Sequence, residues 1–181
     1  MKHAINRRSF LKLGLLAAAL QRPAFAGQKL PAGERRLGLH NLHTGEKVDL
    51  PYWIEGDYVA ESLADINRVL RDHRTGQVAA IDTRLLDLLH RIHAAMGSAH
   101  PFEVISGYRS PASNLMLAEN TAGVARRSLH MDGKAIDVRL PGIALADLRQ
   151  AGLMQRSGGV GYYPKSNFVH LDVGRVRTWG A

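Results

Sequence analysis

The sequence of 181 residues contains no cysteine. Disulfide bonds, thiolate metal ligands and a cysteine nucleophile are therefore excluded. The hydrophobic fraction of 45% is ordinary for a globular protein, and we find no internal repeat, low-complexity tract or linker in the chain. We therefore expect a single domain with a buried core.

Acidic side chains are missing from the first 26 residues, although the chain carries 16 of them in all. The same segment holds five of the 24 basic side chains. Without it, 19 basic and 16 acidic side chains leave a net charge of +3 in place of +8. That balance gives no strong electrostatic footprint for DNA or RNA, so we do not expect nucleic-acid binding.

The N-terminal segment also lacks a hydrophobic run long enough to cross a membrane. Its apolar run covers only residues 13–20, whereas a spanning helix needs about 20 apolar residues. A basic head, a short apolar middle and an Ala-x-Ala end at residues 24–26 are together typical of an export signal that is cleaved after Ala26. The alternative, a basic amphipathic surface helix, leaves the Ala-x-Ala site unexplained.

The pair Arg7-Arg8, followed by Phe10-Leu11-Lys12, resembles the twin-arginine export signal, with Asn6 where Ser or Thr is commoner. We predict that residues 1–26 are a twin-arginine-type export signal and that residues 27–181 form the mature domain, which acts in the periplasm. We expect no transmembrane span after signal removal, because no other segment is long and apolar enough.

The mature sequence favours an α+β fold. Two half-apolar runs that flank a turn predict a hairpin over residues 36–42 and 47–52. Hydrophobic periodicity predicts helices over residues 58–74, 81–96, 113–118 and 144–155, and strands over residues 102–105, 134–140, 159–163 and 168–173. The predicted order along the chain, with helices first and then strands with one helix between them, favours an α+β fold over a doubly wound parallel sheet. We expect a small antiparallel sheet that carries the functional site and packs against helices.

Three side chains are candidate metal ligands: His130, Asp137 and His170. Asp137 lies in an apolar strand, where a carboxylate is costly to bury without a cation or hydrogen bonds. His170 shares one face of a second strand with Asp172. If the two strands are neighbours, two nitrogens and one carboxylate converge in the usual plan of a catalytic zinc site, which keeps a fourth position open.

Simpler interpretations of the same residues stay open. Asp137 can be an edge carboxylate that pairs with Lys134 or Arg139, and a histidine is more often a hydrogen-bonded residue than a ligand. His90 and His93 lie three apart on a predicted helix that lacks the Glu of a His-Glu-x-x-His zinc motif. We interpret that pair as helix surface.

Residues 128–137 match the S-x-H-x-x-G-x-A-x-D signature of the zinc D-Ala-D-Ala peptidases at every fixed position. Residues 105–110 match the segment that comes before it in that family, and residues 158–164 and 168–174 match the closing hairpin. From about Leu37 to Trp179, the chain therefore resembles the zinc D-Ala-D-Ala peptidase family. This group includes VanX, VanY, lysostaphin-type enzymes and the hedgehog domain. The likeness is greatest to its YcbK-like branch of murein endopeptidases.

The resemblance implies that His130, Asp137 and His170 bind Zn²⁺. It also implies that Arg109 holds the substrate's carbonyl or carboxylate, which suits a guanidinium that stays charged and offers forked donors. The alternative for Arg109 is a surface salt bridge. The implied activity is zinc-dependent hydrolysis of amide bonds in peptidoglycan peptide stems.

One departure from the family puts the general base in doubt. Many relatives place an acid three residues before the last ligand, or a histidine two before it. This sequence has Asn167 and Phe168 there, and neither side chain can take a proton from water. Our candidate base is Asp172, which shares a strand face with His170. Its alternative role is to orient His170 by a hydrogen bond.

The sequence leaves three functions open. A cross-link-cleaving murein endopeptidase is the function that we favour, and a D,D- or L,D-carboxypeptidase that trims the stem is the first alternative. The second is a non-hydrolytic, zinc-containing module that binds the cell wall, an interpretation that the missing base at residues 167 and 168 supports.

Overall fold

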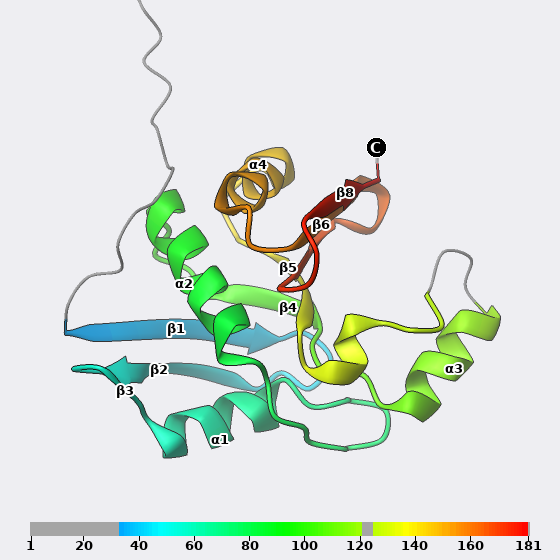
Figure 1. The fold of residues 1–181 in the computed structure, drawn as a ribbon, viewed down its shortest axis with the longest axis horizontal. Coiled ribbons are helices and arrows are strands. Elements are labelled where there is room, and N and C mark those ends of the chain that lie inside the picture. The colour runs from blue at the N-terminus through cyan, green and yellow to red at the C-terminus, as the bar shows by residue number, and fades with distance from the viewer. Residues whose placement is uncertain (1–32, 121–124, 181) are drawn as a thin grey trace, which may run out of the picture.

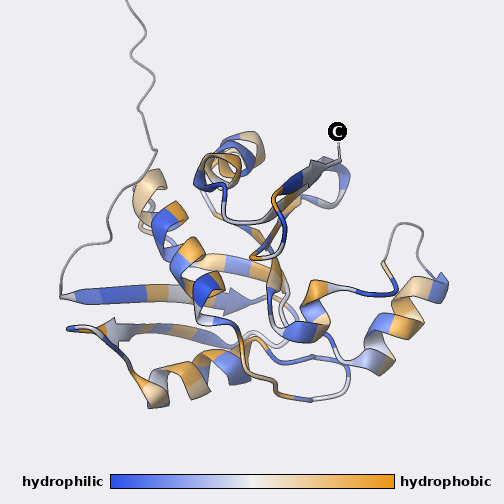
Figure 2. Cartoon of the chain, viewed as in Figure 1, coloured by the Kyte–Doolittle hydropathy of each residue, from blue (hydrophilic) through white to orange (hydrophobic). Residues whose placement is uncertain are grey.

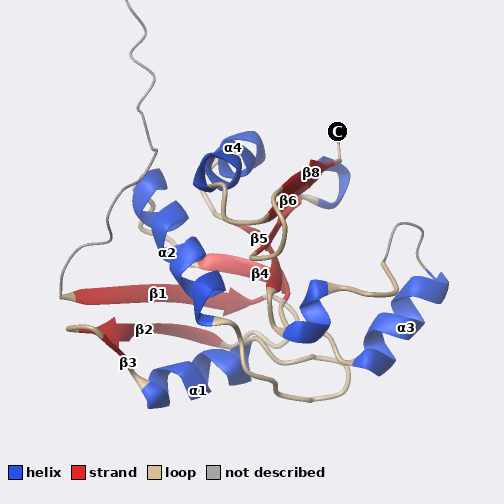
Figure 3. Ribbon diagram, in the orientation of Figure 1, coloured by secondary structure: helices blue, strands red, loops and turns tan. Residues whose placement is uncertain are grey.

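We describe residues 33–120 and 125–180 of a computed structural model of the chain. The predicted export signal, residues 1–26, lies outside the described residues. Within them, four α-helices and two short 3₁₀ turns accompany one sheet (Figures 1 and 3). The helices are α1 (Ala60–Val69), α2 (Thr83–Met96), α3 (Pro111–Asn120) and α4 (Leu145–Gln155), and the turns are η1 (Leu129–Asp132) and η2 (Pro164–Ser166).

The sheet has eight strands in the order β3-β2-β1-β4-β5-β7-β6-β8. They are β1 (Glu34–Asn41), β2 (Lys47–Ile54), β3 (Asp57–Tyr58), β4 (Phe102–Ser106), β5 (Ala135–Arg139), β6 (Gly159–Tyr163), β7 (Phe168–Asp172) and β8 (Arg177–Trp179). The predicted hairpin is confirmed as β1 and β2, which pair antiparallel. The predicted single-domain α+β fold is confirmed as well.

The sheet differs from the predicted small antiparallel one, because it is larger and mixed. The chain leaves β2 through α1 and α2 before it forms β4, so β4 returns beside β1 in the same direction. At the other end, β7 already occupies one edge of β6. Strand β8 therefore takes the free edge of β6 and runs parallel to it. The strands β4, β5 and β7 in the centre do pair antiparallel.

Helix α1 is shorter than the helix predicted over residues 58–74, because a turn replaces its last part. The carboxylate of Asp72 accepts a hydrogen bond from the backbone N of Arg74, and the backbone of Asp72 bonds to Gly76 and Gln77. An aspartate that satisfies the backbone in this way competes with a helix. The turn that follows α1 packs against the chain after β4, since the N of Tyr108 donates to the carbonyl of Leu70.

The core lies between one face of the sheet and helices α1, α2 and α4. Helices α1 and α2 each carry an apolar stripe beside polar positions (Figure 2), and α2 buries Leu85, Leu86, Leu89 and Ile92 completely. Helix α2 begins at an Asp82 cap and ends at Gly97 in the left-handed conformation. Helix α4 covers β6 and β7, where Gly152 lies against Leu171. The alternate residues of β5 and β7 therefore face away from α4.

Among the described residues, no helix is both long enough and apolar enough to cross a bilayer.

Candidate metal centre

His130, Asp137 and His170 meet on the sheet face opposite α4. One ligand atom from each lies within 4.8 Å of the others, and all three side chains are buried. Asp137 of β5 and His170 of β7 are paired residues in adjacent strands, and η1 brings His130 against β5. Three residues from η1, β5 and β7 therefore form one cluster, which we call the candidate metal centre.

The spacing of residues around His130 has a local structural basis. The hydroxyl of Ser128 caps η1, and Gly133 ends it with φ of 64°, a conformation that favours glycine. A Cβ at Gly133 would also collide with the carbonyl of Ala80. The Nδ1–H of His130 donates to the carbonyl oxygen of Gly107 at 2.7 Å. This bond fixes the tautomer and turns Nε2 toward the other two residues.

The three ligand atoms lie close together. The Nδ1 of His170 is 2.9 Å from Oδ1 of Asp137 and 3.2 Å from Nε2 of His130, which is itself 3.4 Å from Oδ1 of Asp137. Burial would raise the pKa of Asp137, but the two imidazoles outweigh it and lower that pKa below its usual range. Burial would lower the pKa of His170, but Asp137 and Asp172 raise it. A metal would therefore compete with protons for this cluster.

The donor set fits zinc. Two imidazole nitrogens and one carboxylate oxygen are the ligand types of catalytic zinc sites. Each histidine has its second nitrogen engaged, His130 with the Gly107 carbonyl and His170 with a carboxylate, as metal-binding histidines usually do. Among the described residues, no lysine or arginine lies closer than 3.7 Å to the buried Asp137 carboxylate, so a cation would compensate its charge well.

Asp172 lies on the side of the His170 ring away from Asp137. Its Oδ2 accepts a hydrogen bond from Nε2 of His170 at 3.0 Å. The carboxylate is fully buried and also accepts from the backbone N atoms of Gly159 and Gly174 and from Arg177. The role of Asp172 as general base stays a prediction, and this placement favours its alternative role of orienting His170.

Arg109 lies beside the candidate metal centre. Its Nη2 is 3.7 Å from Oδ2 of Asp137 and 3.3 Å from the hydroxyl of Ser106, and its Nη1 is 3.4 Å from the amide oxygen of Asn114. The side chain is largely buried, and burial lowers the pKa of its guanidinium. An arginine still keeps its charge. The structure thus places a cation where a substrate oxygen could be held.

The remaining candidates lie elsewhere. His90 bonds to the backbone of Arg36, and His93 bonds to the backbone of His100, both away from the centre. Asn167 is exposed, and Phe168 stacks on Tyr163. The chain therefore offers no base at either position. The sequence did not predict a role for Arg177 or for the Gly107 carbonyl. Arg177 and Trp179 are two residues apart in one strand and therefore share a face, and this spacing could have pointed to Arg177.

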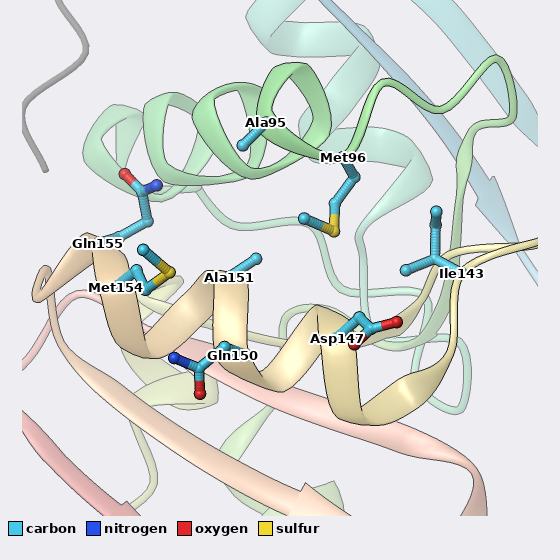
Figure 4. A pocket seen from close by; sticks show the side chains of 8 residues that line it. All are labelled: Ala95, Met96, Ile143, Asp147, Gln150, Ala151, Met154 and Gln155. Carbon is cyan, nitrogen blue, oxygen red and sulfur yellow. The ribbon is translucent and has the colours of Figure 1, made fainter. Parts of the chain in front are cut away.

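An apolar groove of about 270 Å³ lies between α2 and α4 (Figure 4). It is lined by Ala95, Met96, Ile143, Asp147, Gln150, Ala151, Met154 and Gln155. None of these residues belongs to the candidate metal centre, and α4 covers the opposite face of the sheet. We therefore assign the groove no part in the chemistry.

Comparison with known proteins places this site in a family. A family profile described as peptidoglycan L,D-endopeptidase MepK matches residues 29–179. The peptidoglycan L,D-endopeptidase MepK of Escherichia coli (strain K12) is 45% identical over 181 residues, which cover 98% of this chain and 99% of that protein. The protein of the same name from Shigella flexneri has the same identity and coverage.

A more distant relative gives the same result. The probable peptidoglycan L,D-endopeptidase MepK of Haemophilus influenzae is 37% identical over 178 residues, which cover 96% of this chain and 95% of that protein. Both the profile and the full-length relatives include the segments that build the candidate metal centre. The chain therefore belongs to the MepK family of peptidoglycan L,D-endopeptidases.

Proposed function

We propose that this protein is a zinc-dependent peptidoglycan L,D-endopeptidase that hydrolyses amide bonds in cross-linked peptide stems. The observation that carries the proposal is the buried convergence of His130, Asp137 and His170 on one sheet face, in a chain that belongs to the MepK family. The relatives are named as peptidoglycan L,D-endopeptidases, and these names suggest the substrate class.

His130, Asp137 and His170 would hold the zinc ion. When bound, Zn²⁺ polarises the scissile carbonyl and lowers the pKa of its water to about 7. Residues of the chain itself orient the two imidazole ligands. The Gly107 carbonyl and the Asp172 carboxylate hold the two imidazoles so that Nε2 of His130 and Nδ1 of His170 face the same point.

Arg109 supplies positive charge next to that point. Its guanidinium contacts Asp137 and Ser106 and keeps donor capacity for a substrate oxygen. We propose that it stabilises the negative charge that develops on the scissile carbonyl oxygen. A preorganised donor of this kind contributes about 3 to 4 kcal/mol in well-studied hydrolases.

The test is a digest of purified peptidoglycan that contains both L,D and D,D cross-links. We expect the protein to convert L,D-cross-linked dimers to monomers without release of free D-Ala, as measured by separation of the fragments and mass spectrometry. A chelator should stop the reaction, and zinc should restore it. Release of terminal D-Ala would identify a carboxypeptidase, and peptidoglycan binding without cleavage would identify a wall-binding module.

We also propose that residues 1–26 export the protein to the periplasm by the twin-arginine route and that residues 27–181 form the zinc peptidase domain. Peptidoglycan lies outside the cytoplasmic membrane, and the family match begins at residue 29. Replacement of both Arg7 and Arg8 by lysine should leave the uncleaved chain in the cytoplasm. Normal export of that variant, or of the wild type in cells without the twin-arginine translocase, would contradict this route.

A further inference from the structure

One cross-strand row of residues crosses the candidate metal centre and continues to the edge strand. Ser106 pairs with Asp137, Asp137 with His170, His170 with Gly161, and Gly161 with Trp179. Paired residues in adjacent strands project on the same face of a sheet. Trp179 of β8 therefore projects on the face that holds the candidate metal centre.

Gly161 lets the indole of Trp179 reach His170. A Cβ at position 161 would lie 2.6 Å from the indole, so a side chain there would displace the ring. With glycine in between, the ring centroids of Trp179 and His170 lie 5.1 Å apart at an angle of 52°. The indole Nε1 also donates to the hydroxyl of Tyr163 at 2.8 Å, which holds the ring in place.

Arg177 is connected to the Nε2 edge of His170 through Asp172. It lies two residues before Trp179 and therefore on the same strand face. Its Nη2 donates to Oδ2 of Asp172 at 2.7 Å, and this oxygen also accepts from Nε2 of His170 at 3.0 Å. The guanidinium lies 4.8 Å from the centroid of Trp179. Gly159 leaves room for it, since a Cβ there would be 2.5 Å from the guanidinium.

We propose that Arg177 and Trp179 are positioning residues for His170. Through Asp172, Arg177 fixes the Nε2 edge of the imidazole, and Trp179 supports its ring. The short strand β8 thus holds Nδ1 of His170 toward Asp137 and His130. The two glycines at positions 159 and 161 are required because each faces one of these side chains. This inference rests on the proposed zinc site and concerns how the chain prepares it.

The test uses the full chain with Arg177→Gln, Trp179→Leu and Gly161→Ala, and Arg177→Lys as the conservative variant. Zinc affinity is measured by competition with a chromophoric chelator, and the geometry of the ligands by the visible absorption of the Co²⁺-loaded protein. We expect each of the first three variants to lose zinc affinity by about 10- to 100-fold and to show an altered cobalt spectrum. Arg177→Lys should recover part of the loss. Turnover should fall through kcat with KM little changed, because substrate contacts are retained.

Arg175→Gln is the matched control. Arg175 is an exposed arginine in the same connection, two residues from Arg177, and its replacement should leave zinc affinity and the cobalt spectrum unchanged. Circular dichroism confirms that each variant is folded. Folded Arg177→Gln and Trp179→Leu variants with wild-type zinc affinity and an unchanged spectrum would overturn the inference. A wild-type protein that binds zinc but cleaves no peptidoglycan would overturn the proposed function alone, because the affinities still test the positioning role.

Discussion

The Nδ1 atom of His130 lies 2.7 Å from the carbonyl oxygen of Gly107, which comes 23 residues earlier in the chain. The carbonyl is itself held in place, because the next residue, Tyr108, donates its backbone N–H to the carbonyl of Leu70 at 2.7 Å. The turn after α1 and the segment after β4 thus set the orientation of a histidine on η1. A metal-binding histidine is usually oriented by such a bond.

Gly107→Ala should disturb this arrangement. A Cβ at position 107 would lie 2.5 Å from the carbonyl oxygen of Leu70, so the backbone must shift. We expect a loss of about 1 to 3 kcal/mol in the free energy of unfolding, together with weaker zinc binding, because the carbonyl that orients His130 moves. Urea denaturation and chelator competition measure the two effects. A variant with wild-type stability and zinc affinity would show that the site tolerates a shift of this carbonyl.

Asp172→Asn separates the two roles of Asp172. The amide keeps the size of the side chain but removes the charge that Arg177 and His170 contact. We expect zinc affinity and turnover to fall together, since the imidazole loses its carboxylate partner. Zinc titration and turnover are measured on the same preparation. Full zinc affinity with turnover lost would instead support the role of general base, and unchanged turnover would exclude both roles.

The local elements and the candidate ligands could be predicted from the sequence because their signals are local. Hydrophobic periodicity located β1, β2, α2, α4, β5, β6 and β7. The alternation in β7 correctly placed His170 and Asp172 on one strand face. The signature at residues 128–137 pointed to His130 and Asp137, and the match to the closing hairpin at residues 168–174 pointed to His170. The structure brings the three ligand atoms within 4.8 Å of one another.

The remaining features depend on which strands become neighbours. Strand β1 pairs with β4, and β6 pairs with β8, both in parallel. The pattern of apolar residues within each of these four strands does not show which strand will be its neighbour. The contact between Trp179 and His170 depends on a register that passes through Gly161. Asp172 was assigned a face correctly, but only the packed structure shows that its oxygens are already engaged by Arg177 and by backbone N–H groups.

Arg109→Ala should reduce turnover with little effect on zinc binding. The guanidinium lies beside Asp137 without being a candidate ligand, and its charge is partly desolvated by burial. Loss of a donor aimed at a developing oxyanion costs about 100- to 1,000-fold in kcat. Steady-state cleavage of a cross-linked fragment measures this effect. Arg84→Gln is the control, since Arg84 is exposed and pairs only with Asp82 among the described residues. Equal turnover in wild type and Arg109→Ala would exclude the proposed role.

Asp72 should make the free energy of unfolding depend on pH in the acidic range. Burial would raise its pKa, but hydrogen bonds from Ser110 and Ser113 outweigh burial and hold the pKa of this carboxyl well below its usual range. A group whose pKa is lower in the folded state stabilises the fold above its unfolded pKa, which is about 3.9 for aspartate. That stabilisation is lost as the pH falls below about 4. The carboxylate also joins the turn after α1 to the N of Ser110, at the start of α3.

Asp72→Asn should therefore flatten the acid limb of the stability curve. We expect lower stability at pH 7, by about 1 to 3 kcal/mol, and a smaller further loss between pH 5 and pH 3 than in the wild type. Part of the acid dependence should stay, because the pKa values of Asp137 and Asp172 are lowered as well. Urea denaturation at each pH measures these differences. Asp49→Asn, at an exposed carboxylate, is the control and should follow the wild type. If Asp72→Asn loses as much stability with acid as the wild type, the carboxylate of Asp72 does not carry this dependence.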